Sequence, residues 1–183
     1  MPKKFLVISG GLAPGVPIDF YARLTALAKA HQVRVVLDAN GPALHAALQT
    51  GVFLFKPSLR ELRELTGQAL PDEASWVAAC QHLIQTGQAE VVALSLGEDG
   101  AMVISANQSW RSPGLKVDVH TTIGAGDSFV AGMVWAFSQD HQVLKAFQYG
   151  MAAGAGALLG TGTSLCQAHD VHGLLPQVVV HAV

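Results

Sequence analysis

The chain has 183 residues, of which 50% are hydrophobic and 13% are charged, which is typical of a compact globular protein and excludes a largely disordered one. The formal net charge is -2, and the lysine and arginine residues are scattered, which argues against a nucleic-acid or membrane partner. The two cysteines, Cys80 and Cys166, cannot form a disulfide framework, and we expect them to be reduced. We find no signal peptide after Met1 and no apolar run long enough to cross a bilayer, so the sequence predicts a cytoplasmic protein.

Short apolar runs alternate with segments of helical periodicity through most of the chain. Residues 5–9 form an apolar run that ends at a glycine pair, which is typical of a strand buried on both faces. Further strands are expected at 33–38, 52–55, 91–96 and, after a tight turn, 97–105. Helices are expected at 18–31, 42–50, from 58 onward, and at 72–86, 127–138 and 142–159. The alternation predicts an α/β fold, with a mostly parallel sheet flanked by helices and a single domain over residues 1–183.

Polar or glycine-rich residues follow four of the expected strands. They are Ser9–Gly10, Asp38, Lys56–Ser58 and Ser95–Gly97. The carboxyl ends of parallel strands meet at one edge of a sheet, where open α/β folds bind their ligands. The sequence therefore predicts a ligand site at this edge.

The segment TTIGAGDSFVAGM, Thr121 to Met133, places an aspartate directly behind a glycine loop at the expected start of a helix. Glycines let the backbone approach a bulky anion, and the N–H groups of a helix start favour negative charge. The loop is neither a P-loop nor a dinucleotide fingerprint, because the remaining motif residues are absent. Asp127 would repel a bound phosphate, so one interpretation is that it accepts the proton of an attacking hydroxyl in phosphoryl transfer. The alternative is that Asp127 only complements the helix dipole.

With these motifs in order along the chain, the sequence resembles the ribokinase-like, or PfkB, carbohydrate kinases. The matching segments are VISGGLAPGV, LDANGPAL, FKPSLREL, ALSLGEDGAM, the glycine–aspartate loop and GTGTSLC. The branch that the chain resembles most contains 6-phosphofructokinase, 1-phosphofructokinase and tagatose-6-phosphate kinase. The resemblance implies a three-layer α/β/α fold and covers only the later part of the family's chain. We therefore expect a kinase truncated at the N-terminus, without the early strands and the β lid.

The resemblance assigns roles to matched positions. It makes Asp127 the catalytic base and Gly124, Ala125 and Gly126 the anion hole for the transferred phosphate. Lys56, Ser58, Ser95, Gly97 and Gly100 match nucleotide-binding positions, and Ser9, Gly10 and Asp38 match substrate-binding positions. Glu61 matches a glutamate that organises magnesium through water. Main-chain groups at Thr121, Ile123, Ala157, Gly160, Gly162 and Ser164 match a loop that holds potassium in many relatives.

One position departs from the family pattern, because Ser58 stands where the family has asparagine. Serine is shorter than asparagine and offers one hydroxyl in place of an amide. The segment SLRE, from Ser58 to Glu61, is also a capping box, in which Ser58 caps a helix and Glu61 bonds back to it. The structural and functional roles can coexist.

The function implied by the resemblance is ATP-dependent phosphorylation of a phosphorylated ketohexose, with Mg and, in addition, K as candidate cofactors. The chain alone is expected to be an incomplete catalyst. The alternative is a non-catalytic remnant or interaction module that keeps the nucleotide-binding fold. An open sheet edge near residues 5–9 would favour a homo-oligomer or a partner chain that covers it.

Overall fold

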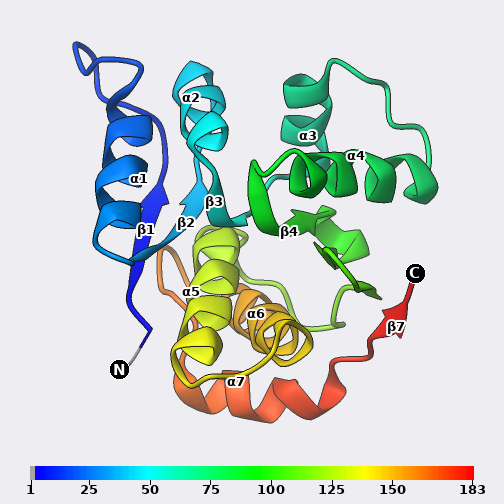
Figure 1. Cartoon of the computed structure of the whole chain (residues 1–183). Coiled ribbons are helices and arrows are strands. Elements are labelled where there is room, and N and C mark those ends of the chain that lie inside the picture. The colour runs from blue at the N-terminus through cyan, green and yellow to red at the C-terminus, as the bar shows by residue number, and fades with distance from the viewer. Residues whose placement is uncertain (1–2) are drawn as a thin grey trace. The chain divides into compact units, whose positions relative to one another are not determined.

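The computed structural model describes residues 3–183 (Figure 1). Its backbone divides into two compact units. The first unit comprises the chain up to Ser95 together with Ile104–Ser109, and the second comprises Leu96–Val103 and Trp110–Val183. The single domain over residues 1–183 remains a prediction.

The first unit repeats a strand-then-helix pattern, as the periodicity predicted. Its elements are β1 (Phe5–Ser9), α1 (Phe20–Ala30), β2 (Arg34–Asp38), α2 (Pro42–Thr50), β3 (Val52–Phe55), α3 (Leu59–Thr66), α4 (Glu73–Gln85) and β4 (Ala89–Ser95). The strands lie in chain order, and the pairs β1–β2, β2–β3 and β3–β4 are all parallel. The register places Ser9 opposite Asp38 and Leu54 opposite Val91. The four carboxyl ends therefore meet at one edge, as expected.

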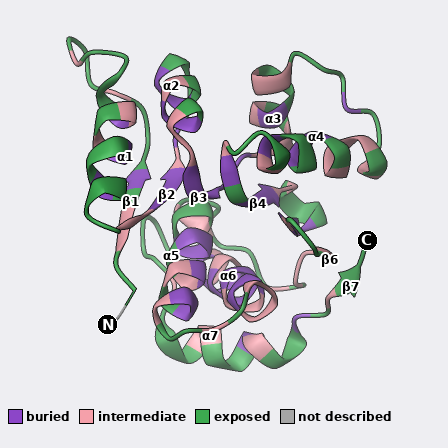
Figure 2. Cartoon of the chain, in the orientation of Figure 1, coloured by how far each residue is buried: buried purple, intermediate pink, exposed green. Residues whose placement is uncertain are grey.

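The core of the first unit lies on the central strands. Leu37, Leu54 and Val92 are fully buried on β2, β3 and β4, and Figure 2 shows these strands mostly in the colour of buried residues. The prediction that residues 5–9 are buried on both faces is wrong. On β1 only Ile8 is buried, and the side chain of Val7 is 46% exposed. The reason is position, because β1 comes first in the strand order and its neighbour among the described strands is β2.

Capping residues set the helix boundaries. α2 begins with Pro42 in its first turn and ends at Gly51, as the sequence predicted. Asp72 caps α4 by accepting a hydrogen bond from the Ser75 backbone N–H at 2.9 Å, and the bonds from Ser75 lower the pKa of the Asp72 carboxyl. On α4, burial raises the pKa of the Cys80 thiol to about 12, so this thiol stays protonated.

The second unit is mainly helical. It contains the short 3₁₀ turns η1 (Gly97–Asp99) and η2 (Leu175–Gln177), the helices α5 (Ala125–Ser138), α6 (Val143–Leu158) and α7 (Ala168–Leu174), and the strand β7 (His181–Ala182). The strands β5 (Ala101–Ser105) and β6 (Ser109–Ser112) contribute residues to both units, and β6 pairs antiparallel with β7.

The helices α5 and α6 form the core of this unit. The rings of Phe129 and Phe147 meet edge to face, with their centroids 6.2 Å apart, and Met133 is fully buried between these helices' apolar faces. Although both helices are strongly apolar, the described part of the chain contains no helix with the length and hydropathy that a membrane crossing requires.

Candidate functional site

In the first unit, the polar residues at the strand ends lie together. Ser9 pairs with Asp38 in the β1–β2 register, and the Gly10 backbone N–H donates to the Asp38 carbonyl at 2.9 Å. The Lys56 backbone N–H donates to the Leu37 carbonyl at 3.0 Å, which continues the ladder into the next strand end. The structure thus brings together the predicted substrate and nucleotide positions of β1, β2 and β3.

Asp38 and Lys56 form an ion pair at this edge. The Lys56 Nζ lies 3.1 Å from Asp38 Oδ1, and the two side chains are only 9% and 19% exposed. A partly desolvated pair of this kind holds each charge in place, because either partner alone would be a poorly solvated charge. The family resemblance assigned Asp38 and Lys56 separate roles and did not reveal that they are partners.

Ser58 and Glu61 form the predicted capping box at the start of α3. The Ser58 backbone N–H and hydroxyl both donate to Glu61 Oε2, at 2.7 and 2.9 Å. The Glu61 backbone N–H donates to the Ser58 hydroxyl oxygen at 3.2 Å. The structural role considered for these residues is therefore confirmed, and it fixes the orientation of the Glu61 carboxylate.

Ser95, the fourth strand end, lies next to this cap. Its backbone N–H donates to the Pro57 carbonyl at 2.9 Å, and Ser58 and Ser95 form a parallel bridge. The cap and the end of β4 are therefore held in register by main-chain bonds.

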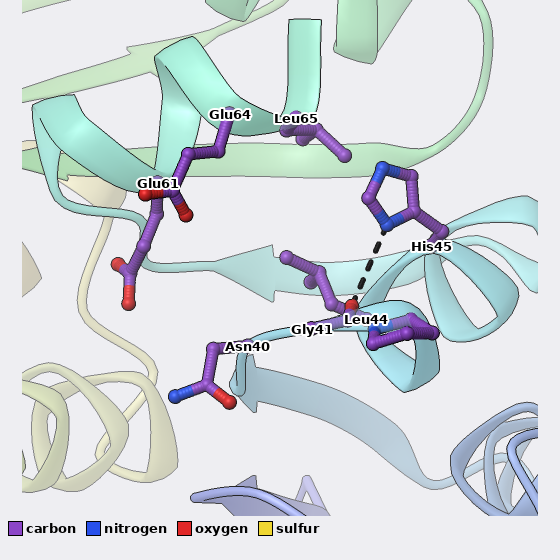
Figure 3. Close-up of a pocket in the computed structure, with 8 residues that line it drawn as sticks. Asn40, Gly41, Leu44, His45, Glu61, Glu64 and Leu65 are labelled. Atoms are coloured by element: carbon purple, nitrogen blue, oxygen red, sulfur yellow. Dashed lines mark hydrogen bonds between the residues drawn. The ribbon is translucent and has the colours of Figure 1, made fainter.

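A pocket of about 490 Å³ opens beside Glu61, between the start of α2 and the length of α3 (Figure 3). The residues that line it are Asn40, Gly41, Pro42, Leu44, His45, Glu61, Glu64 and Leu65. Leucines from both helices give it an apolar floor, while an amide, an imidazole and two carboxylates can contact a polar ligand. Of these residues, sequence reasoning identified only Glu61. The run Asn40–Pro42, polar and directly behind the β2 end, was the signal that could have indicated the others.

The residues that could serve a metal in the first unit are few. The described part of the chain contains no group of three or more histidine, cysteine, aspartate or glutamate side chains placed to hold a metal ion. Magnesium commonly keeps several waters and binds through one or two carboxylates and the phosphates of a nucleotide. Glu61 fits that mode. Ser58 fixes its Oε2 by two hydrogen bonds, and its other carboxylate oxygen can accept from a water of the magnesium ion.

The double role of Ser58 leads to a prediction about stability. We expect Ser58→Ala to lower the free energy of unfolding by about 1 kcal/mol, because it removes the N-cap of α3. Ser58→Asn should stay close to the wild type, because asparagine caps helices as well as serine does. Urea unfolding of the three chains measures the difference. Equal losses for both variants would show that the cap is not what Ser58 contributes.

In the second unit, the glycine–aspartate loop forms the start of α5. Gly124 is the N-cap, with φ of 79°, and Asp127 lies in the first turn. A Cβ at Gly124 would lie 2.9 Å from Leu165 Cδ2, the end of an exposed side chain that can move aside, so it is the backbone angle that requires glycine. The first N–H groups of a helix have no partner within the helix and can bind an anion. Asp127 is exposed, and the Ser128 side chain behind it is buried.

Gly97 and Gly100 frame the η1 turn. The Leu96 backbone N–H donates to the Gly100 carbonyl at 2.9 Å, and the Gly100 N–H donates to the Gly97 carbonyl at 3.2 Å. Gly100 is buried with φ of 93°, and a Cβ there would overlap the Ser112 carbonyl oxygen. Gly97 has φ of 64° but open space around it. Packing therefore requires glycine at 100, whereas only the backbone angle favours it at 97.

The positions matched to a potassium loop also lie together. The backbone N–H groups of His120 and Thr121 both reach the Leu158 carbonyl, and the Thr121 hydroxyl donates to the Gly162 carbonyl at 3.0 Å. The Gly160 N–H donates to the Ala157 carbonyl at 3.2 Å. These bonds hold the two loops next to each other, and main-chain carbonyl oxygens are among the donors that a hard cation uses.

The predicted site residues thus form two groups. Ser9, Gly10, Asp38, Lys56, Ser58, Glu61 and Ser95 belong to the first unit. Gly97, Gly100, Thr121, Ile123, Gly124, Ala125, Gly126, Asp127, Ala157, Gly160, Gly162 and Ser164 belong to the second.

Curated proteins with similar sequences are phosphofructokinases. The chain is 39% identical over 167 residues to ATP-dependent 6-phosphofructokinase isozyme 2 of Mycobacterium tuberculosis, covering 91% of this chain and 49% of that protein. It is 35% identical over 166 residues to the isozyme 2 of Escherichia coli, covering 90% of this chain and 53% of that protein. The chain therefore spans about half the length of the curated relatives it matches.

A solved structure agrees with the sequence comparison. The phosphofructokinase-2 of Escherichia coli in complex with potassium superposes with a TM-score of 0.91 at 32% identity, covering 96% of this chain and 58% of that one. This match confirms the predicted ribokinase-like α/β fold and its partial extent. The model of the pfkB family carbohydrate kinases matches residues 2–170, and the chain therefore belongs to that family.

Proposed function

We propose that the chain is the nucleotide-binding part of an ATP-dependent sugar-phosphate kinase and that Asp127 is its base. The observation that carries the proposal is the turn at the start of α5. There Gly124 takes a left-handed conformation and Asp127 follows in the first helical turn, in a chain of a carbohydrate kinase family. A helix start supplies N–H groups for a phosphoryl group, and an adjacent carboxylate supplies a proton acceptor.

In this mechanism, the N–H groups at 124–126 hold the transferring phosphoryl group. The acceptor hydroxyl attacks the γ-phosphorus of ATP, the bond to the bridging oxygen breaks, and ADP leaves. The hydroxyl proton passes to a carboxylate oxygen of Asp127. The transition state is loose, so a weak base that takes the proton late is sufficient. When bound, magnesium would neutralise charge on the phosphates, and Glu61 would orient it through water.

The proposed acceptor is a phosphorylated ketohexose, as for a 6-phosphofructokinase, a 1-phosphofructokinase or a tagatose-6-phosphate kinase. The names of the relatives support this class, because they include both 6-phosphofructokinases and 1-phosphofructokinases. A potassium ion on the carbonyls near Thr121 and Gly162 is part of the proposal. It is supported by the two adjacent loops and by the potassium complex of the Escherichia coli relative.

A second candidate function is a non-catalytic module that binds nucleotide or a partner chain. One observation favours it, namely the 46% exposure of Val7 on β1, the first strand in the strand order. Such an edge can pair with a second chain, whether a copy of this one or a different partner.

The test of the proposal is stabilisation by nucleotide. ATP with magnesium at about a hundred times its dissociation constant should add roughly 2.7 kcal/mol to the free energy of unfolding. Thermal unfolding with ATP and magnesium, compared with magnesium alone, measures this effect. An unchanged melting temperature at millimolar ATP would refute a working nucleotide site.

A further inference from the structure

Residues 160–166, called here the 160–166 segment, lie against the glycine–aspartate turn. The segment follows α6, has no helix or strand of its own, and is exposed from residue 161 to 165. Three contacts attach it. The Thr121 hydroxyl bonds to Gly162, the Ser128 hydroxyl oxygen accepts from the Cys166 backbone N–H at 3.4 Å, and Leu165 lies over Gly124. The segment is therefore attached on both sides of the turn.

The Thr121 hydroxyl makes two bonds at once. It donates to the Gly162 carbonyl at 3.0 Å, across 41 residues of sequence. It also accepts from the backbone N–H of Ile123 at 3.2 Å. One oxygen thus fixes the backbone immediately before Gly124 and ties that backbone to the 160–166 segment.

These contacts constrain the backbone that leads into α5. Residues 121–124 lead into α5, so their path sets where the N–H groups at the helix start point. Rate and affinity at a phosphoryl site depend steeply on such placement. The Cys166 bond reaches Ser128, which follows the turn in sequence, and Leu165 lies against Gly124 within the turn. Thr121 instead holds the backbone that precedes the turn.

We propose that Thr121 is a positioning residue for the phosphate-binding turn, acting through its hydroxyl bonds to Gly162 and Ile123. The inference rests on the proposed nucleotide site. The role belongs to the Thr121 hydroxyl and is separate from the proposed binding of a potassium ion by main-chain oxygens of the same loop. Loss of the hydroxyl would leave Gly162 and Ile123 without these bonds and allow the turn to move.

The test compares Thr121→Val, which keeps the shape and removes the hydroxyl, with Thr121→Ser, which keeps the hydroxyl. Thr163→Val is the matched control, because Thr163 is exposed on the same segment and its hydroxyl is not among the contacts above. Two quantities are measured on the full chain. One is amide hydrogen exchange over residues 122–128, with the amides of α6 as an internal reference for folding. The other is the dissociation constant of ATP with magnesium, by calorimetric titration.

We expect Thr121→Val to speed exchange over 122–128 without affecting α6 and to weaken ATP binding about 10-fold, as the loss of one or two hydrogen bonds implies. Thr121→Ser and Thr163→Val should stay within about 2-fold of the wild type. Thr121→Ala should behave as the valine variant does, which guards against a misfit of the valine side chain.

Several outcomes would overturn the proposal. Weaker ATP binding with unchanged exchange would mean direct contact with the nucleotide, and faster exchange with unchanged binding would mean a purely structural bond. A serine variant as impaired as the valine variant would show that the methyl group matters and not the hydroxyl. A wild-type chain that binds no ATP would overturn the proposed function and the nucleotide part of this inference, while exchange would still decide whether Thr121 holds the turn.

Discussion

Asp127→Asn is expected to lower the rate of sugar-phosphate phosphorylation by a factor on the order of 10²–10⁴, the usual loss when a general base is removed. The variant keeps the size of the side chain and removes both its charge and its basic oxygen. ATP binding should survive or tighten, because a negative charge near the phosphates is gone. The fold should change little, because Asp127 is exposed in the first turn of α5. Its favourable contact with the helix dipole is worth only about 0.3–1 kcal/mol.

The measurement needs an acceptor held in place, since positioning supplies much of the catalysis in phosphoryl transfer. The chain should therefore be assayed with the part of a phosphofructokinase relative that it does not match, supplied as a second polypeptide. Asp118→Asn is the control, because that carboxylate is highly exposed and contacts His120. Equal rates for wild type and Asp127→Asn would remove Asp127 from its proposed role. Absence of activity in both would favour the non-catalytic alternative.

Gly100→Ala is expected to lower the free energy of unfolding by about 3 kcal/mol or more. Two costs add at this position. The φ of 93° strains any residue that has a Cβ, and the new Cβ would overlap the Ser112 carbonyl oxygen, which belongs to the backbone and cannot rotate away. To make room for the Cβ, the η1 turn and the backbone of residues 112–114 would have to move apart.

Gly97→Ala is the matched control, in the same turn. Its φ of 64° is a left-handed angle that alanine adopts at modest cost, whereas φ 93° with ψ -132° at Gly100 lies in a region that other residues avoid, and no atom lies within 4 Å of a Cβ at 97. A loss of about 1 kcal/mol is expected. Urea unfolding of both variants measures the difference. Equal losses at 97 and 100 would show that neither the contact with Ser112 nor the unusual backbone conformation of Gly100 adds to the cost of a positive φ.

Local patterns predicted most of the first unit. Each strand there contains an apolar run, and two of the helices have side-chain caps, Ser58 at α3 and Asp72 at α4. The sequence missed β6, α7 and β7, because β6 and β7 are four and two residues long and α7 has seven residues, too few to show a period. It also overstated the burial of β1, since burial depends on neighbouring strands and not on the strand's own composition.

The sequence predicted some parts of the site and missed others, as it did for the fold. The rule that ligands bind at strand ends correctly brought Ser9 and Asp38 together, and the glycine–aspartate loop was correctly placed at a helix start. The Asp38–Lys56 ion pair and the Thr121–Gly162 bond were not predictable, because no local pattern links residues so far apart in sequence. The pocket beside Glu61 was missed for the same reason, since it forms only when α2 and α3 lie side by side.

The strand order of the first unit has a consequence for how the chain folds as it is synthesised. β2 pairs with β1, β3 with β2, and β4 with β3, so each of these strands finds its parallel partner already made when it leaves the ribosome. None of the three has to insert between two earlier strands. The loops closed at each step are short on the scale of the chain, which keeps the entropy of closure low. The first unit can therefore assemble one strand-and-helix pair at a time, before α5 and the glycine–aspartate turn at its start have been translated.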